Sequence, residues 1–154
     1  MNEIFRKRHA CRRFKNREVS EGDLKVVLEA AESAPSAGGL KARKILVITD
    51  QKERDEIVKV TSAWNQKFLD QAPVLLVFIA VPDIAIARFG ERALNLYALQ
   101  DATIAVSFAW LQAVDLGLSA CWIGAFDEVA LKKILKLDGS SRPVAILPLG
   151  YSAE

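Results

Sequence analysis

Residues 91–116 read ERALNLYALQDATIAVSFAWLQAVDL, and the fold can be inferred outward from them. Apolar residues recur here at helical spacing and cover more than one stripe around the predicted helix. At 1.5 Å per residue such a helix is about 36 Å long or more. A helix that is apolar on nearly all sides is buried, but a chain of 154 residues is too short to cover it everywhere. We therefore expect a second subunit to complete its cover.

The segments on either side of this helix alternate between strand and helix patterns. Apolar runs predict strands at 45–48, 74–81, 119–123 and 144–149, and the run at 74–81 is apolar enough to be buried on both faces. Helices are predicted at 21–33, from about 51, and at 128–135, with Ser20, Asp50 and Asp127 as their capping residues. With the long helix and a helical N-terminal part, this order favours layered α+β architecture over a plain doubly wound sheet.

Composition bounds the class of protein. The chain is 51% hydrophobic and 26% charged, which is ordinary for a globular protein. No repeat, linker pattern, signal-peptide core or long uninterrupted apolar run occurs, so we expect one domain over 1–154, a cytoplasmic location and no membrane span. Cys11 and Cys121 do not suggest a disulfide framework. Since His9 is the only histidine, a multi-histidine metal site is excluded within one chain, and no metal site is predicted.

Charge is distributed unevenly along the chain. Residues 1–17 hold seven basic residues against Glu3 alone, whereas the remainder holds 14 basic and 18 acidic residues. A basic segment on an acidic body indicates an anionic ligand: a nucleic acid, a membrane surface or one small phosphate. The glycine patterns of dinucleotide-binding folds and of P-loops do not occur, so a bound nucleotide must be held another way.

Three segments are candidates for a site. The first is Arg6-Lys-Arg-His-Ala-Cys-Arg-Arg-Phe14, whose arginines suit phosphate oxygens, although a solvated or nucleic-acid-binding arm is an equal alternative. The second is Ala34-Pro-Ser-Ala-Gly-Gly-Leu-Lys-Ala-Arg43, whose small residues let a flat ligand approach the backbone or merely end a helix. The third is Gly117–Asp127, a predicted strand that ends before a capped helix, which is a common place for ligands. Within it, Cys121 is expected to be a buried apolar residue and not a nucleophile.

These segments, in this order, resemble the FMN-dependent nitroreductase family in a short form. The first is similar to that family's N-terminal phosphate-binding motif, and the second to its Ala-Pro-Ser-Ala loop. Gln71-Ala-Pro-Val-Leu-Leu-Val is similar to a family strand, Asp101 lies where the family has an aspartate in its long dimer helix, and Leu116–Asp127 is similar to its Trp-Ile-Gly segment. The closing Pro143–Tyr151 matches the family's last strand, so the resemblance covers nearly the whole chain.

The resemblance implies a three-layer fold, with a central mixed sheet flanked by helices, in an intertwined homodimer that binds FMN at its interface. By the same resemblance, the residues of the first segment that hold the phosphate, ribityl and pyrimidine groups are Arg8, His9, Ala10 and Arg12. The residues that line the isoalloxazine from the other subunit are Pro35, Ser36, Ala37 and Gly39, and the backbone of Ile123 and Gly124 approaches the ring.

The implied activity is oxidation of NADH or NADPH by FMN, followed by reduction of a small-molecule acceptor such as a nitroaromatic or a quinone, in ping-pong fashion. Because the flavin carries the chemistry, no catalytic side chain is predicted. Neither nucleic acid nor a membrane is an implied partner. The alternatives are a specialised family member with another flavin reaction, a non-catalytic flavin-binding protein, and a nucleic-acid-binding protein that uses the basic arm.

The sequence departs from the family pattern at several positions. Gly39 and Lys41 stand where the loop usually has Asn and Gln, and Ala10 replaces a Ser. Family members also continue past the position of Glu154 with a segment that often adds a basic residue to the phosphate site. Two outcomes are open: the surplus N-terminal arginines compensate, or FMN binds more weakly.

Overall fold

The computed structural model describes residues 1–61 and 67–154. The α-helices are α1 (Glu3–Lys7), α2 (Glu21–Ser33), α3 (Gln51–Thr61), α4 (Ile86–Phe89), α5 (Ala98–Asp115) and α6 (Glu128–Ile134). Shorter helical turns are η1 (Ala37–Gly39), η3 (Lys67–Gln71) and η4 (Pro82–Ile84), and η5 (Ala93–Tyr97) is a π-helical turn. The strands are β1 (Arg43–Ile48), β2 (Val74–Ala80), β3 (Ser119–Ala120) and β4 (Arg142–Gly150). The predicted α+β class is confirmed.

The four strands form one sheet in the order β1-β2-β4-β3, with every neighbouring pair antiparallel. Among the described residues, parallel pairing, which the expected mixed sheet requires, occurs only at an isolated bridge between Ala10 and Ala120. The strand predicted at 119–123 is interrupted after Ala120, yet Ile123 pairs with Ile146 in the same register. The interruption follows the point where the N-terminal segment pairs with Ala120.

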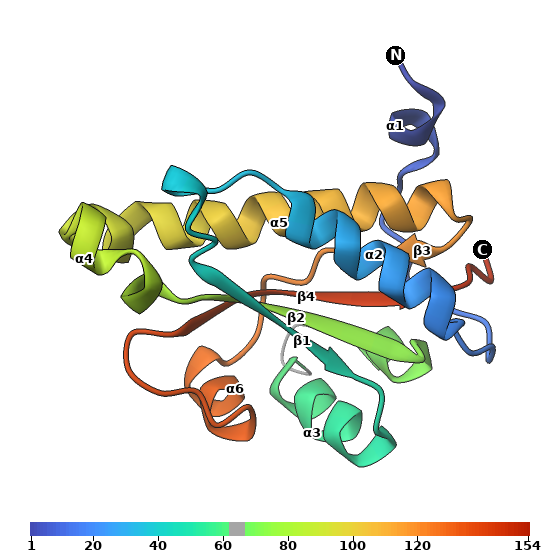
Figure 1. The fold of residues 1–154 in the computed structure, drawn as a ribbon. Coiled ribbons are helices and arrows are strands. Elements are labelled where there is room, and N and C mark those ends of the chain that lie inside the picture. Colours follow the sequence, from blue (N-terminus) through green and yellow to red (C-terminus); the bar gives the residue numbers. More distant parts are fainter. Residues whose placement is uncertain (62–66) are drawn as a thin grey trace.

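Helices cover both faces of this sheet, which gives three layers (Figure 1). On one face α2 and α5 pack against Leu76 and Phe78 of β2, together with alternate residues of β4. On the other face α3 and α6 pack against Leu75 and Val77. Because successive side chains of a strand point to opposite faces, β2 serves both cores, and all of its residues are buried as predicted.

The long helix is less regular than the sequence predicts. It is helical from Glu91, passes through the π-helical turn η5, where Arg92 Nε donates to the Tyr97 hydroxyl over 2.8 Å, and continues as α5 from Ala98. Its buried stripe consists mainly of alanines and lets α2 and the sheet approach closely. Leu94 and Phe108 remain 37% and 38% exposed, so part of the apolar surface has no cover within the described chain.

Helix α2 has a capping side chain at each end. The Ser20 hydroxyl accepts a hydrogen bond from the Asp23 amide over 3.0 Å, as the sequence predicts. At the other end, the buried Arg43 donates from Nη2 to the carbonyls of Ala31 and Ala34. The predicted caps of α3 and α6 are also present, since Asp50 and Asp127 each accept an amide hydrogen bond from the first turn.

Replacing Ser20 by Ala should lower the free energy of unfolding by about 1 kcal/mol, because the Asp23 amide loses its acceptor. Urea unfolding followed by circular dichroism measures the change. Ser20→Asp keeps a capping oxygen and should remain close to wild type. Equal losses in the two variants would show that the cap has no role.

No helix within residues 1–61 and 67–154 combines the length and the apolar character needed to cross a bilayer.

Candidate functional site

The basic arm, residues 6–17, is held in place by backbone hydrogen bonds to distant parts of the chain. The Cys11 amide donates to the Ala120 carbonyl over 3.0 Å, next to the bridge between Ala10 and Ala120. Further along, the Lys15 amide donates to the Tyr151 carbonyl, and the Ala153 amide donates to the Arg13 carbonyl. The arm therefore lies between β3 and the C-terminal residues, in a defined conformation.

The arginines of the arm are available to an anion. None of Arg6, Arg8, Arg12 and Arg13 forms an ion pair with a described carboxylate. The Arg8 guanidinium stacks 4.7 Å from the ring centroid of Trp110 on α5, an attraction that orients it without using its N–H donors. A guanidinium that is oriented but unpaired is suited to bidentate contact with phosphate.

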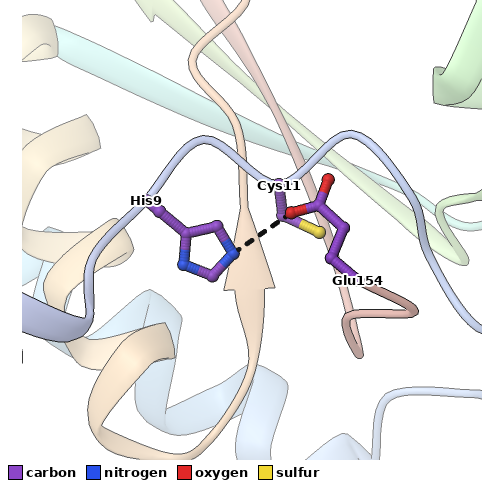
Figure 2. A group of neighbouring side chains, drawn as sticks. All are labelled: His9, Cys11 and Glu154. Atoms are coloured by element: carbon purple, nitrogen blue, oxygen red, sulfur yellow. Dashed lines mark ion pairs between the residues drawn. The ribbon is translucent and has the colours of Figure 1, made fainter.

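An acidic side chain from the other end of the described chain also reaches the arm. The Arg12 amide donates to Glu154 Oε1 over 2.9 Å, and His9 Nε2 lies 3.5 Å from Glu154 Oε2. Figure 2 shows the imidazole and the carboxylate facing each other across this gap. The Arg12 amide and the His9 ring thus lie next to the Glu154 carboxylate, within the segment predicted to hold phosphate.

The loop that follows α2 is organised by a single buried carboxylate. Asp101 of α5, 2% exposed, accepts the Ala37 amide on Oδ1 over 2.9 Å and the Ala42 amide on Oδ2 over 3.0 Å. The Ser36 hydroxyl accepts the Lys41 amide over 2.9 Å. Side-chain hydrogen bonds from Asp101 on α5 and from Ser36 within the loop therefore hold the loop backbone in place.

The two loop glycines have different surroundings. Both have positive φ, +59° at Gly38 and +72° at Gly39, a conformation that favours glycine. A Cβ on Gly38 would come within 2.8 Å of Arg88 Nη1, whereas a Cβ on Gly39 would meet nothing within 4 Å. Gly38 is therefore required by packing, while Gly39 faces open space that a ligand can enter.

A cavity of about 390 Å³ opens beside this loop. Its lining includes Pro35, Ser36 and Ala37 of the predicted site, with aromatic walls from Phe89 and Tyr97, whose rings stack edge to face. Its volume falls within the range of small-molecule sites, and its lining is mostly apolar with a few polar groups. It can take a flat ring system.

In the third segment, Ile123 and Gly124 have different backbone roles. The amide and the carbonyl of Ile123 both hydrogen-bond to Ile146 over 2.9 Å, and its side chain is buried. The Gly124 amide forms no hydrogen bond with a described residue. Ile123 therefore anchors the segment to the sheet and leaves Gly124 as the member of the pair with an amide free for a ligand.

A single chain brings the arm and the third segment together but keeps the loop apart from them. The arm contacts α5 at Trp110, whereas the loop is tied to α5 at Asp101. Nine positions along an α-helix correspond to about 14 Å. In Figure 1 the N-terminus and β3 lie near one end of α5, and the loop lies toward the other end. Within one chain the two halves of the predicted site therefore contact α5 about 14 Å apart.

Some of these contacts are not evident from the sequence. Trp110 and Glu154 belong to none of the sequence motifs, whereas Asp101 stands out as an acidic residue within an apolar helix. Another cavity, of about 510 Å³, contains none of the predicted site residues. The Arg54 guanidinium at this cavity already donates to the Ala72 carbonyl and to the Gln51 side chain.

Cys121 should react slowly with alkylating agents. It is only 3% exposed, and burial raises the pKa of its thiol, an effect that the Arg12 guanidinium opposes. The reactive thiolate therefore forms at a higher pH than in a free cysteine. In the variant Cys11→Ser, iodoacetamide labelling at pH 8 followed by mass spectrometry should give much slower modification in the native chain than in urea. Equal rates in the two states would contradict this account.

Comparison with known proteins shows which family has this architecture. The sequence profile described as the nitroreductase family matches residues 5–64 and 59–151. An NADH dehydrogenase of Thermus thermophilus is 27% identical over 96% of this chain and 84% of its own. An NADPH-dependent oxidoreductase of Staphylococcus aureus is 27% identical over 98% of this chain and 64% of its own.

Solved structures agree with these sequence matches. An FMN-dependent nitroreductase from Clostridium difficile superimposes with a TM-score of 0.85 at 29% identity, covering 98% of this chain and 87% of its own. A nitroreductase family protein from Clostridium novyi superimposes with a TM-score of 0.88 at 26% identity, covering 99% and 84%. The profile match extends over nearly the whole sequence, and the fold agrees with it. The chain belongs to the nitroreductase family.

Proposed function

We propose that this chain is an FMN-dependent oxidoreductase that takes electrons from NADH or NADPH and acts as a homodimer with FMN at the interface. The names of its relatives support this proposal: an NADH dehydrogenase, an NADPH-dependent oxidoreductase and an FMN-dependent nitroreductase. Nitroaromatics, quinones or similar small molecules are the proposed acceptors. Bound FMN supplies the redox chemistry by accepting and passing on a hydride in two separate half-reactions.

The observation that carries the proposal is the anion-binding character of the arm. The Arg12 amide and the His9 imidazole already surround the Glu154 carboxylate, and the nearby Arg8 guanidinium has no ion-pair partner among the described residues. A phosphate group needs several N–H donors converging on its oxygens. The guanidinium groups of Arg8 and Arg12 fit that need, so Arg8 and Arg12, with the backbone at His9 and Ala10, are proposed to hold the phosphate end of FMN.

The proposed ring site combines the loop of one chain with the third segment of the other. Pro35, Ser36 and Ala37 line an apolar cavity, and Gly39 faces open space. From the partner, the Gly124 amide is the donor proposed to meet the edge of the ring, with Ile123 holding it in place. The exposed Phe108 and Leu94 along the long helix supply apolar surface for the dimer contact.

The protein's own share of the reaction is to bind and orient. The loop backbone is fixed by Asp101, and Phe89 and Tyr97 line the cavity beside it with aromatic surface suited to a flat ring. No side chain is proposed to move a proton. Gly39 and Lys41, in place of side chains that could hydrogen-bond to the ring, favour a second candidate: a flavin-binding member of the family with a different reaction or with none.

Visible absorption of the purified protein tests the proposal. We expect a yellow protein whose flavin spectrum is bleached anaerobically by NADH or NADPH and recovers on adding a quinone or a nitroaromatic. A yellow protein that neither nicotinamide bleaches would replace the lead with the non-catalytic candidate. A colourless protein that takes up no added FMN, yet binds mixed-sequence DNA in a salt-dependent manner, would overturn both flavin candidates.

A further inference from the structure

Three side chains with metal-binding atoms meet where the basic arm contacts the C-terminal residues. His9, Cys11 and Glu154 each bring one ligand atom, and these atoms all lie within 4.8 Å of one another. Figure 2 shows the three side chains pointing toward one another from two segments far apart in the sequence. Imidazole, thiolate and carboxylate together form a donor set typical of zinc.

The imidazole of His9 is oriented by a hydrogen bond to a backbone carbonyl. Its Nδ1 lies 3.0 Å from the Lys7 carbonyl, and since a carbonyl oxygen can only accept, Nδ1 carries the proton. In the neutral ring, Nε2 then presents its lone pair. Metal-bound histidines are commonly oriented by such a hydrogen bond to a backbone carbonyl on the far side of the ring.

The carboxylate is oriented in the same way. Glu154 Oε1 accepts the Arg12 amide over 2.9 Å, which leaves Oε2 facing the imidazole. Nε2 and Oε2 are 3.5 Å apart. Two ligands of one tetrahedral zinc ion, each about 2.1 Å from the metal, lie about 3.4 Å apart. The observed spacing therefore suits two ligands of one zinc ion.

The third ligand completes the charge balance. Cys11 is fully buried, and its Sγ donates to the Arg13 carbonyl over 3.2 Å, so the thiol is held on the inner side of the cluster. On binding, the thiol loses its proton, and the thiolate and carboxylate together offset the two charges of the ion. The ion and its two anionic ligands are therefore neutral together, although binding exchanges one thiol proton for a divalent ion.

We propose that His9 Nε2, Cys11 Sγ and Glu154 Oε2 bind one zinc ion, with a fourth position open to water or another exchangeable ligand. Because the ligands come from the arm and from Glu154, the bound ion links these two parts of the chain. The site depends on these three side chains and not on the flavin. Its test is therefore made without added FMN, and a negative result leaves the proposed oxidoreductase function unaffected.

Competition of the full chain with a chromophoric zinc indicator tests the site. We expect one zinc per chain, an affinity at least about tenfold weaker in Cys11→Ser and in Glu154→Gln, and little change in Cys121→Ser. Cobalt in place of zinc should give a thiolate charge-transfer band in the wild type and in Cys121→Ser, but not in Cys11→Ser. Zinc should also raise the Tm of the wild type but not of Glu154→Gln.

Several results would overturn the site. These are the absence of saturable binding at one zinc per chain, wild-type affinity in Glu154→Gln, or loss of the cobalt band in Cys121→Ser and not in Cys11→Ser. Since Glu154 is exposed, Glu154→Gln decides the question even if Cys11→Ser does not fold.

Discussion

Replacing Asp101 by Ala is expected to lower the free energy of unfolding by about 2–5 kcal/mol, because two amides lose their shared acceptor. The carboxylate is 2% exposed and accepts from Ala37 and Ala42, which lie on either side of the loop turn. Water cannot easily reach these amides in place of Asp101, so each loses a partner without compensation. The loop should also open, and amide hydrogen exchange at Ala37 and Ala42 should become faster.

Two further variants separate this effect from a general weakening of α5. Asp115 lies on the same helix but is exposed, so Asp115→Ala should stay within about 0.5 kcal/mol of the wild type. Asp101→Asn keeps one acceptor oxygen but turns an amide group toward the second N–H, and should fall between the two. Urea unfolding gives all three values. Equal losses for Asp101→Ala and Asp115→Ala would contradict the organising role of Asp101.

Replacing Arg8 by Ala is expected to weaken FMN binding by about ten- to a hundredfold, the loss of a charge-assisted contact worth about 1.5–3 kcal/mol. Arg8 is held against Trp110 at 4.7 Å and makes no ion pair with a described residue. Its donors are thus free for phosphate. Arg8→Lys keeps the charge but loses the planar fork, and should lie between Ala and wild type.

The neighbouring Lys7 provides a control of equal charge. Its ammonium pairs with Glu3 at 3.0 Å, so Lys7→Ala removes one cation from the arm without touching the proposed phosphate donors. Fluorescence titration of flavin-free protein with FMN measures both variants. If Lys7→Ala and Arg8→Ala weaken binding equally, the arm acts through its overall charge, and the specific assignment of Arg8 is wrong.

Local patterns in the sequence predict the regular elements well. The helix at 21–33 and its Ser20 cap are confirmed, because capping and apolar spacing act within a few residues. The doubly buried strand β2 is also confirmed, since its apolar run matches burial on both faces. The interruption of the predicted strand after Ala120 has a different, long-range origin. It accompanies pairing with a segment more than a hundred residues away, which no local pattern encodes.

In the candidate site, too, some features can be predicted from the sequence and others cannot. The family resemblance identifies the arm and the loop as segments, but the contacts that fix them join residues far apart in sequence. Asp101 reaches Ala37 and Ala42 across the loop, and Glu154 reaches His9 and Arg12 from the opposite end of the chain. A pattern of residue types predicts what a segment can bind, whereas only the fold reveals which donors are already used.

The central claim is that each flavin site is shared by two chains, the arm of one and the loop of the other. Two variants disable the two halves: Arg8→Ala with Arg12→Ala in the arm, and Gly39→Val in the loop, where a branched side chain at φ +72° is strained and fills the open space. Each variant alone should form dimers with little FMN.

Mixed dimers of the two variants, isolated through two different affinity tags, provide the direct measurement. In such a dimer a shared site carries either both defects or neither. We predict one FMN per mixed dimer, bound with wild-type affinity. Binding no stronger than in either parent dimer would mean that each chain holds its flavin alone, and would contradict the shared site.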